Sequence, residues 1–505
     1  MSAGSFPSVC IRNIISHLEY DYKSLHTCIL LNKNWFLESI DKLWIDPFIY
    51  NKKLSSCNKK RNFCLINTYI KCLKPEIRRF LNIKITLNSI TCDYIGYLQH
   101  IRTEIMSLCI LSWLEFTRNI LNKNNIFQAI CEHIILKSNN IKTIHLHGEM
   151  AFNIFKLPDS YFTLSSVKYF KYCLDYTHLK HFEDVLHHAT KISKRIEHIE
   201  ISYISENRPG ENGHSNLLPS YLMFGNFMKT QRDLKKLIFR YLDFTSVFNV
   251  LKNRTDFNLI NITKIQLIGI KHENYQLILN ELSLFVNLTH LKIHECSNFY
   301  FEEKLFTLTK NNNILLSKLS KISLQNNISF SQEFLNIILI RSGKNIKKLH
   351  LYDAIDVKIF PAILACCYNL NYYSCLINGN NYYFIVDIIR NSTNLNRLKI
   401  GFYENTNEDS ILPISILSDI AKNIKVTLRS LKLSIFLCDD SFLTKEIFIK
   451  FFKILSERKV KLKYLKITGW NKLINNTNLI NEIITNNCDI TNFDVIKICN
   501  TSFNK

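Results

Sequence analysis

The chain has 505 residues, of which 47% are hydrophobic and 12% aromatic, and its formal net charge is +22. This apolar content excludes a globally disordered chain, and the length exceeds what one hydrophobic core usually organises unless the core is elongated and repetitive. With 11 Gly and 8 Pro, the sequence holds too little turn chemistry for an all-β sandwich or for an enzyme with many Gly-rich loops.

The positive charge leaves two interpretations open. Lys and Arg total 64 against 42 Asp and Glu, a balance that favours nucleic acid or an acidic partner. However, the lysines are scattered and KKLSSCNKKR at 52–61 is the only dense cluster. An A/T-rich coding sequence would produce the same excess, so the charge is also explained without a selected surface.

Cysteine usage and the N-terminus bear on the compartment. The 16 cysteines are spread over the whole chain, whereas a small secreted protein concentrates its disulfides. The first residues, MSAGSFPSV, lack the basic and apolar stretches of a signal peptide, and no window holds about 18 uninterrupted apolar residues. We therefore expect a cytoplasmic or nuclear protein without a membrane span.

The first 50 residues predict three short helices. Apolar residues at Ile11, Ile14, Ile15 and Leu18 form one stripe at helical spacing, after a helix start at Pro7. Asp21 is the predicted N-cap of the second helix and Asn34 that of the third, which ends before Pro47. Three such helices bury little surface by themselves, so apolar side chains should remain exposed for a partner.

These residues resemble a known motif. Phe6-Pro7, then Ile14 and Leu18, Leu25, the run Leu31 to Trp35, and Leu43-Trp44 follow the order and spacing of the F-box. The ending LWIDPF at 43–48 is closest in wording to fungal F-box proteins. The resemblance covers about 45 residues, and the expected F-box domain spans residues 1–50.

The resemblance implies a docking unit. Its apolar side chains would bind the Skp-type adaptor of a cullin-based ubiquitin ligase, and the residues it assigns to this contact are Phe6, Pro7, Ile11, Ile14, Leu18, Leu25, Leu31 and Trp35. The alternative is that the same side chains are only the core of a small N-terminal cap.

Residues 51–139 join this unit to the remainder of the chain. They are expected to be mostly helical, with LINTYIKCL at 65–73 as the clearest amphipathic piece, and to include the start of the next domain. No flexible linker is evident. The join should therefore be stiff.

One phrase recurs from residue 140 onward. It consists of an apolar residue, two polar residues, an apolar residue, a variable residue and an apolar residue. It occurs as IKTIHL (141–146), IEHIEI (196–201), LKKLIF (234–239), ITKIQL (262–267), LTHLKI (288–293), LSKISL (319–324), IKKLHL (346–351), LNRLKI (395–400), LRSLKL (428–433) and LKYLKI (462–467), with weaker versions VKYFKY (167–172), LNYYSC (370–375) and ITNFDV (490–495).

Helical patterns separate the copies, for instance at 125–136, 331–343 and 381–392. Strand then helix, repeated at this period, is typical of leucine-rich repeats. The expected fold is therefore α/β, with a leucine-rich-repeat solenoid (horseshoe) over 140–505. Cys296 and Asn327 occupy the usual Asn or Cys position after the strand, but most copies lack it, so the solenoid should be irregular.

The variable position of each phrase should point to the concave face of the solenoid. Lysine dominates the C-terminal half of this column, which reads His145, Glu200, Ile238, Gln266, Lys292, Ser323, His350, Lys399, Lys432 and Lys466. Lysine supplies point charges to carboxylate or phosphate. We therefore expect Lys292, His350, Lys399, Lys432 and Lys466 to bind an acidic or phosphorylated client, unless they are ordinary solvated residues of a Lys-rich chain.

No motif predicts chemistry within the chain. There is no C-x2-C pair, HEXXH, complete phosphate loop or G-x-S-x-G elbow. We expect no catalytic residue, metal or cofactor. The predicted function is a substrate receptor of a Skp-cullin-F-box ubiquitin ligase, which binds an unidentified client protein. A basic nucleic-acid-binding scaffold or a general protein-interaction repeat scaffold is the alternative, with nucleic acid disfavoured because the aromatic residues fall mainly in the apolar phase.

Overall fold

The computed structural model describes most of the chain. The described residues are 6–19, 21–48, 59–83, 93–117, 122–150, 152–203, 218–242, 259–270, 275–296, 316–325, 332–351, 359–377, 382–403, 415–436, 445–460 and 462–468. The chain divides into two compact units, Met1–Arg240 with Ser246–Asn258, and Tyr241–Thr245 with Leu259–Lys505. The boundaries expected at residues 50 and 139 stay a prediction.

The first unit opens with the three predicted helices, α1 (Ser8–His17), α2 (Tyr22–Cys28) and α3 (Lys33–Trp44). Asp21 caps α2 as predicted, since its carboxylate accepts a hydrogen bond from the Ser24 amide. The prediction for α3 is wrong by two residues. Asn32, in an extended conformation, accepts from the amides of Asn34 and Trp35, so Asn34 already lies in the first turn.

The described residues between α3 and β2 are mostly helical. Their elements are α4 (Lys59–Cys72), α5 (Pro75–Phe80), the short 3-10 helix η3 (Tyr94–Tyr97), strand β1 (His100–Arg102), α6 (Thr103–Thr117) and α7 (Lys123–Lys137). The sequence pattern did not predict β1. It pairs in parallel with β2, Ile101 opposite Ile144, and so adds a strand ahead of the first recognisable phrase.

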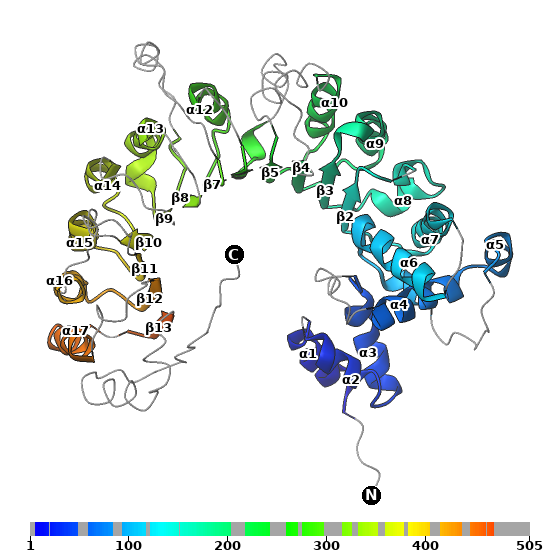
Figure 1. The fold of residues 1–505 in the computed structure, drawn as a ribbon, viewed down its shortest axis with the longest axis horizontal. Helices are drawn as coiled ribbons and strands as arrows, with labels where there is room; N and C mark the ends of the chain where they lie inside the picture. The colour runs from blue at the N-terminus through cyan, green and yellow to red at the C-terminus, as the bar shows by residue number, and fades with distance from the viewer. Residues whose placement is uncertain are drawn as a thin grey trace, which may run out of the picture. The chain divides into compact units, whose positions relative to one another are not determined.

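Strands and helices alternate through the rest of the first unit. The strands are β2 (Thr143–His147), β3 (Tyr169–Leu174), β4 (His198–Tyr203) and β5 (Lys236–Arg240). Between them lie η4 (Ile154–Lys156), α8 (Ser160–Leu164), η5 (Tyr176–His178), α9 (Leu179–Ile192) and α10 (Leu218–Lys229). Figure 1 shows helices α7 to α10 on one side of strands β2 to β5.

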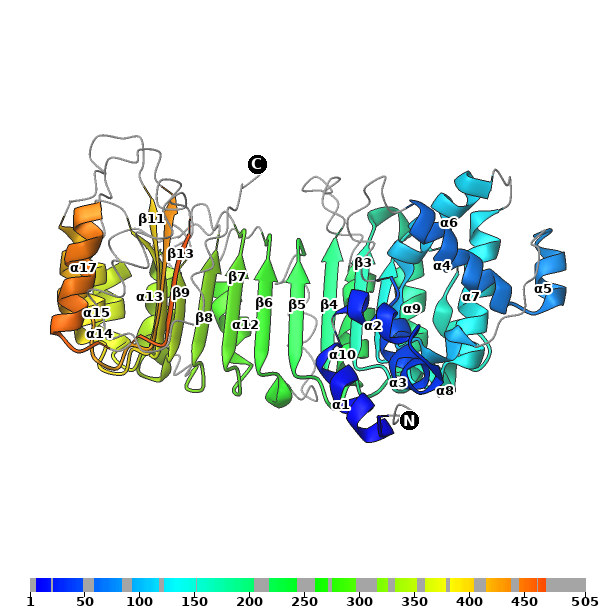
Figure 2. The same ribbon diagram turned by 90° about the horizontal axis from the view of Figure 1, so that it is seen from below.

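The second unit continues the same alternation. It holds η7 (Leu259–Asn261), β6 (Lys264–Ile268), α12 (Tyr275–Ser283), β7 (His290–His294), β8 (Lys321–Gln325), α13 (Gln332–Ser342), η10 (Gly343–Asn345), β9 (Lys348–Leu351), α14 (Phe360–Cys366), β10 (Tyr372–Ile377), α15 (Tyr382–Asn391), β11 (Arg397–Tyr403), α16 (Ile416–Asn423), β12 (Ser430–Phe436), α17 (Lys445–Glu457) and β13 (Tyr464–Thr468). Figure 2 shows β6 to β9 side by side in chain order.

The recurring phrase is the strand of each repeat. Every copy from 141 to 467 forms a parallel strand that begins at the third residue of the phrase, while ITNFDV at 490–495 lies outside the described residues. The first apolar residue precedes the strand and is buried in every copy, as at Ile141, Leu319 and Leu370. The described residues thus form an α/β solenoid of the leucine-rich-repeat type in each unit, with thirteen strands in chain order.

Alternation within the strand separates core from surface. The fourth and sixth residues of the phrase point into the core, as Ile144 and Leu146 do in β2, while the fifth points to the opposite face. After β7, Cys296 is fully buried and its Sγ lies 3.2 Å from the His294 carbonyl oxygen. This confirms its predicted place in the turn; Asn327 lies outside the described residues.

Candidate functional site

The predicted concave-face column lies in register in the second unit. Residues paired across neighbouring parallel strands run Gln266, Lys292, Ser323, His350, Ser374, Lys399, Lys432 and Lys466. Neighbouring strands lie about 4.8 Å apart, so Lys399, Lys432 and Lys466 follow one another on consecutive strands. The five residues proposed for client binding therefore share one face; what they bind stays a prediction.

A second column on the same face escaped the sequence analysis. It lies two residues earlier in each strand and runs Lys264, His290, Lys321, Lys348, Tyr372, Arg397, Ser430 and Tyr464. The third residue of each phrase could have predicted this column, because residues i and i+2 of a strand point to the same face of the sheet. Lys264, Lys348 and Arg397 are exposed, so this column doubles the cationic side chains on the face.

We call these two columns over β6 to β13 the basic face. The sequences of these eight described strands contain no Asp or Glu, but eight Lys or Arg residues and three His residues. The charged side chains within these described strands are therefore all basic.

Burial is the main influence on two histidines of the basic face, and neighbouring lysines act in the same direction. Burial lowers the pKa of His350 to about 4, helped by Lys321, Lys399, Lys348 and Lys292. Burial and the neighbouring lysines Lys264, Lys321 and Lys348 likewise lower the pKa of His290. His350 is thus neutral at pH 7.

The basic face also carries an aromatic pair. The His350 ring stacks on the Tyr372 ring with centroids 4.3 Å apart and an interplanar angle of 27°. The two residues come from neighbouring strands, β9 and β10. Lysine pKa values are affected as well, since burial and the nearby Lys432 lower the pKa of Lys399.

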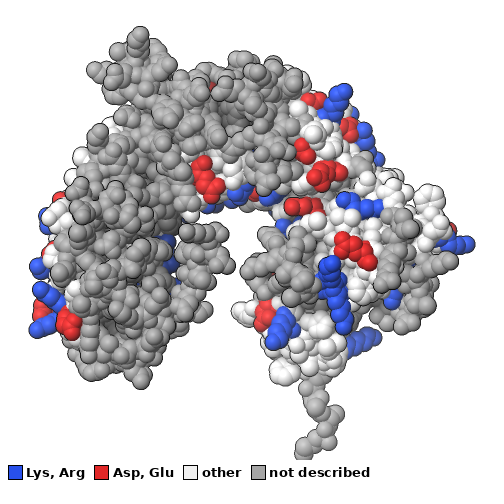
Figure 3. Space-filling model, viewed as in Figure 1, with Lys and Arg blue, Asp and Glu red and all other residues white. Residues whose placement is uncertain are grey.

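The corresponding face of the first unit is neutralised internally. Glu200 on β4 is buried and meets Lys171 Nζ at 2.9 Å and Arg240 Nε at 2.8 Å, and it accepts a hydrogen bond from the Tyr169 hydroxyl. Over this unit, Figure 3 shows Lys and Arg (blue) interspersed with Asp and Glu (red). Lys171 and Arg240 thus share one carboxylate partner within this unit.

The three N-terminal helices expose part of their apolar surface. Of the residues assigned to adaptor binding, Phe6, Ile14 and Leu31 are 59%, 40% and 57% exposed, and Pro7 is also exposed. Val9, which the prediction did not include, is 66% exposed. These side chains remain available to a partner.

Two of the assigned residues require correction. Ile11 and Leu25 are fully buried, and together with Ile15 and Cys28 they form the core of the three-helix unit. Leu18 and Trp35 are half-buried against that core. The helical stripe that suggested a contact surface is largely the inner face of α1, so Ile11 and Leu25 support the fold instead.

A buried ion pair connects the end of the three-helix unit to the first strand of the solenoid. Asp46, two residues after α3, is 4% exposed and lies 2.7 Å from Arg102 Nη2 on β1, whose side chain is 12% exposed. Arg102 Nη1 also lies 2.9 Å from His145 Nδ1 on β2. The Gln99 amide donates to the Ile45 carbonyl at 3.1 Å. These contacts join α3 to the first strands of the sheet, while the stiffness expected from the sequence stays a prediction.

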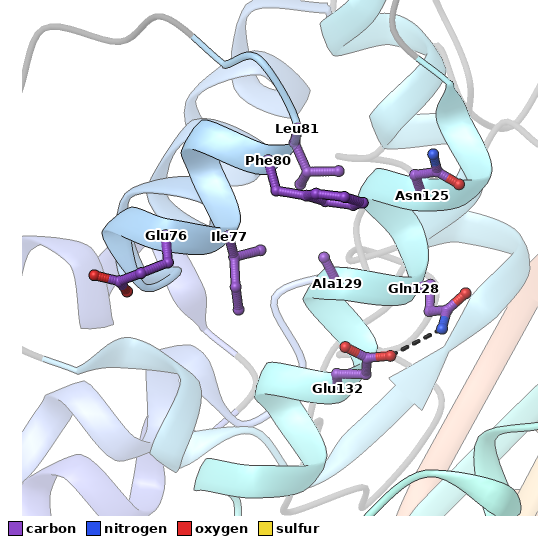
Figure 4. A pocket seen from close by; sticks show the side chains of 8 residues that line it. All are labelled: Glu76, Ile77, Phe80, Leu81, Asn125, Gln128, Ala129 and Glu132. Carbon is purple, nitrogen blue, oxygen red and sulfur yellow. Dashed lines mark hydrogen bonds between the residues drawn. The ribbon is translucent and has the colours of Figure 1, made fainter.

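An acidic groove lies between α5 and α7. It measures about 540 Å³ and its lining includes Glu76, Phe80 and Glu132. Figure 4 shows Phe80 reaching from α5 toward α7, Glu76 pointing away, and the Gln128 side chain donating to Glu132. Phe80 is 82% exposed. The groove combines an apolar ring with carboxylates and so differs in charge from the basic face.

Within the described residues, no group of three His, Cys, Asp or Glu side chains is arranged to hold a metal ion. None of the helices in that part of the chain is long and apolar enough to cross a membrane.

Comparison with known proteins yields remote likenesses. No protein-family model matches the chain, and neither does any curated protein sequence. Among solved structures, the chain is similar to the leucine-rich repeat-containing protein LegL7 from Legionella pneumophila, with a TM-score of 0.33 and 15% identity over 55% of this chain and 83% of that one. It is also similar to a chain of the Rad7 and Elc1 complex from yeast, with a TM-score of 0.29 and 15% identity over 58% of this chain and 64% of that one. The fold assignment rests on the strand order and register above.

Proposed function

We propose that the chain is a substrate receptor of a Skp-cullin-F-box ubiquitin ligase. In this proposal the three-helix unit binds a Skp-type adaptor, and through it a cullin, while the basic face binds a client protein. The observation that carries the client half is the register that aligns cations over β6 to β13 without a carboxylate in those strands. The adaptor half rests on the F-box resemblance together with the exposed apolar side chains.

The exposed apolar side chains support adaptor binding. Phe6, Val9 and Ile14 lie on or just before α1, and Leu31 lies between α2 and α3. Large apolar side chains that stay exposed on a small unit are typical of protein contacts. Beneath them, Ile11 and Leu25 belong to a buried core that the unit forms within itself.

The basic face supports binding of an acidic or phosphorylated segment. Lysine and arginine form charge-assisted hydrogen bonds with carboxylate and phosphate, and several cations on consecutive strands allow one extended segment to make several such contacts. His350 and Tyr372 add a flat aromatic surface beside them.

The contacts between α3 and the first strands support a role in bringing two partners together. An adaptor on α1 to α3 and a client on the solenoid would be held on one chain, which raises their effective concentration. The chain itself then makes and breaks no bond, and catalysis belongs to the ligase partners.

Adaptor binding is tested with a Val9→Asp, Ile14→Asp double variant of the full chain. Both side chains are exposed on α1, so the fold should persist while co-purification of a Skp-type adaptor falls by about tenfold or more. Lys33→Glu, a charge change at an exposed position on α3, is the matched control and should bind normally. Undiminished capture by the double variant, with adaptor bound by the parent chain, would refute the docking surface.

Client binding is tested with Lys399→Glu, Lys432→Glu and Lys466→Glu combined. Reversing three charges on consecutive strands should abolish capture of an acidic or phosphorylated client, since like charges then face it. The control combines Lys344→Glu, Lys450→Glu and Lys453→Glu, which are exposed on helical segments of the same unit. If both triple variants capture the same proteins as the parent, the basic face has no role in client selection.

A nucleic-acid scaffold is the second candidate, and the basic face also favours it. It predicts binding of a single-stranded oligonucleotide that weakens steeply with salt. The same two triple variants distinguish the candidates, because the nucleic-acid role requires Lys399, Lys432 and Lys466 for the oligonucleotide and not for a protein client.

A further inference from the structure

A cavity lies between the three-helix unit and α4. It measures about 590 Å³, within the range of small-molecule sites. Its lining is made by α2, by the C-terminal end of α3 and by α4. These three elements are close in sequence and line the same cavity. The cavity belongs wholly to the first unit and lies on different elements from the basic face.

The charged residues of this cavity are all cationic or titratable to a cation. Lys23 and His26 come from α2 and Arg61 comes from α4, and among the described residues that line the cavity there is no Asp or Glu. The nearest acidic cap, Asp21, holds its carboxylate against the Ser24 amide and hydroxyl. The groove between α5 and α7 shows the opposite pattern, since its described lining includes two glutamates and no Lys, Arg or His. The described linings of the two cavities therefore differ in the sign of their charged residues.

The remainder of the lining is mainly apolar and fixed in place. Leu43, Trp44 and Leu65 form part of it. The Trp44 ring is packed against Tyr94 at 4.6 Å and Tyr69 at 5.9 Å between centroids, and Leu65 is 8% exposed. Such a surface offers a preformed apolar contact to a ligand, because it needs no rearrangement before binding.

We propose that this cavity binds an amphiphilic carboxylate, a molecule with an apolar body and a single anionic head group. The apolar body would lie against Trp44 and Leu65 and exclude water from them. The carboxylate would face Lys23 and His26, which are exposed at the rim. The proposal is independent of the adaptor and client surfaces, since neither includes these residues.

The experiment uses three matched probes on the full chain, each below its micelle-forming concentration. Laurate carries the tail and the anionic head, dodecyltrimethylammonium carries the same tail with a cationic head, and acetate carries the head alone. The thiol of Cys64 lines the cavity and is exposed, and Cys10 on α1 is exposed outside it. Iodoacetamide labelling of each thiol, followed by peptide mass spectrometry, reports occupancy.

Laurate is expected to protect Cys64 and leave Cys10 reactive, while the other two probes protect neither. A Lys23→Glu, His26→Glu variant should bind laurate about tenfold more weakly or worse, and Thr68→Phe should fill the cavity from α4 and abolish protection. Lys60→Glu, an exposed α4 residue outside the cavity, should behave as the parent. Circular dichroism checks that each variant is folded.

Three results would overturn the proposal. Equal protection of Cys64 by laurate and by the cationic amphiphile would show an apolar cavity without charge selection. Equal protection of Cys64 and Cys10 would show non-specific association. Laurate affinity that is unchanged in the folded Lys23→Glu, His26→Glu double variant and also in the folded Thr68→Phe variant would place the ligand elsewhere.

Discussion

Replacing Arg102 by methionine is expected to destabilise the first unit by about 3–5 kcal/mol. The substitution leaves the Asp46 carboxylate, 4% exposed, without the guanidinium that lies 2.7 Å from it. A buried carboxylate without a counter-charge carries a large desolvation penalty. Because Asp46 follows α3 and Arg102 lies on β1, the loss should loosen the join between the three-helix unit and the solenoid.

A double variant separates this effect from a loss of packing. Arg102→Met combined with Asp46→Leu removes both charges, and such apolar replacements of buried ion pairs are often close to neutral. Urea unfolding should therefore place the double variant above the Arg102→Met single variant in stability. A double variant less stable than either single one would mean that the pair contributes net stabilisation beyond charge compensation.

Replacing Glu200 by glutamine is expected to cost roughly 3 kcal/mol at pH 7. Burial by itself raises the pKa of Glu200, but the hydrogen bond from Tyr169 and the cations Lys171 and Arg240 outweigh it and lower the pKa to about 2. The variant retains a hydrogen-bonding side chain and loses the negative charge. Two half-buried cations then lack their common partner.

The same pKa fixes the pH dependence of this loss. Because an unfolded glutamate has a pKa of about 4.3, the stabilisation by Glu200 is present above that pH and is lost as the pH falls toward 2. Denaturant unfolding at several pH values should show the parent and variant converging in acid. A stability difference that stays constant from pH 7 to pH 2 would exclude this ion cluster as its cause.

Glu197 provides the matched control for Glu200. Hydrogen bonds from Lys168 and Lys235 lower its pKa to about 2 as well. Those lysine side chains are 63% and 57% exposed, so water screens the interaction and holding the long side chains costs entropy. Glu197→Gln should therefore cost at most about 1 kcal/mol, despite a similar pKa.

The repeats could be predicted because local pattern and tertiary environment agree. In IKTIHL, Ile144 and Leu146 alternate with polar residues, which is the spacing of a strand buried on one face. The same pattern predicted every phrase up to residue 467 correctly. Strand β1 was not predicted, because His100 and Arg102 flank a single apolar residue and three residues are too few to show a strand alternation.

The N-terminal unit shows where pattern alone misleads. A stripe of apolar residues on a helix marks a buried face, but it does not say whether the same chain or a partner covers it. In α1, the chain itself covers Ile11 and leaves Ile14 at the edge. The cap of α3 was misassigned for a related reason, since Asn32 and Asn34 have equal propensity and only the backbone of Asn32 is extended.

The ion pairs between repeats were not predicted from the sequence, although the phrase positions of some partners indicated that they would be neighbours. Lys171 and Glu200 occupy the same position of consecutive phrases, which places them side by side once the register is known. Arg102 and Asp46 share no phrase, and 56 residues separate them. Pairs of this second kind become visible only when β1 is recognised as part of the sheet.

Strand order has a consequence for how the protein loses its structure. Within each unit, a strand pairs with the strands that precede and follow it in the chain, so its contacts are of low contact order. Cooperativity in such an array is passed between nearest neighbours instead of through one central core. Repeats at an end can therefore unfold before the repeats next to them, and a single two-state transition need not describe the whole chain.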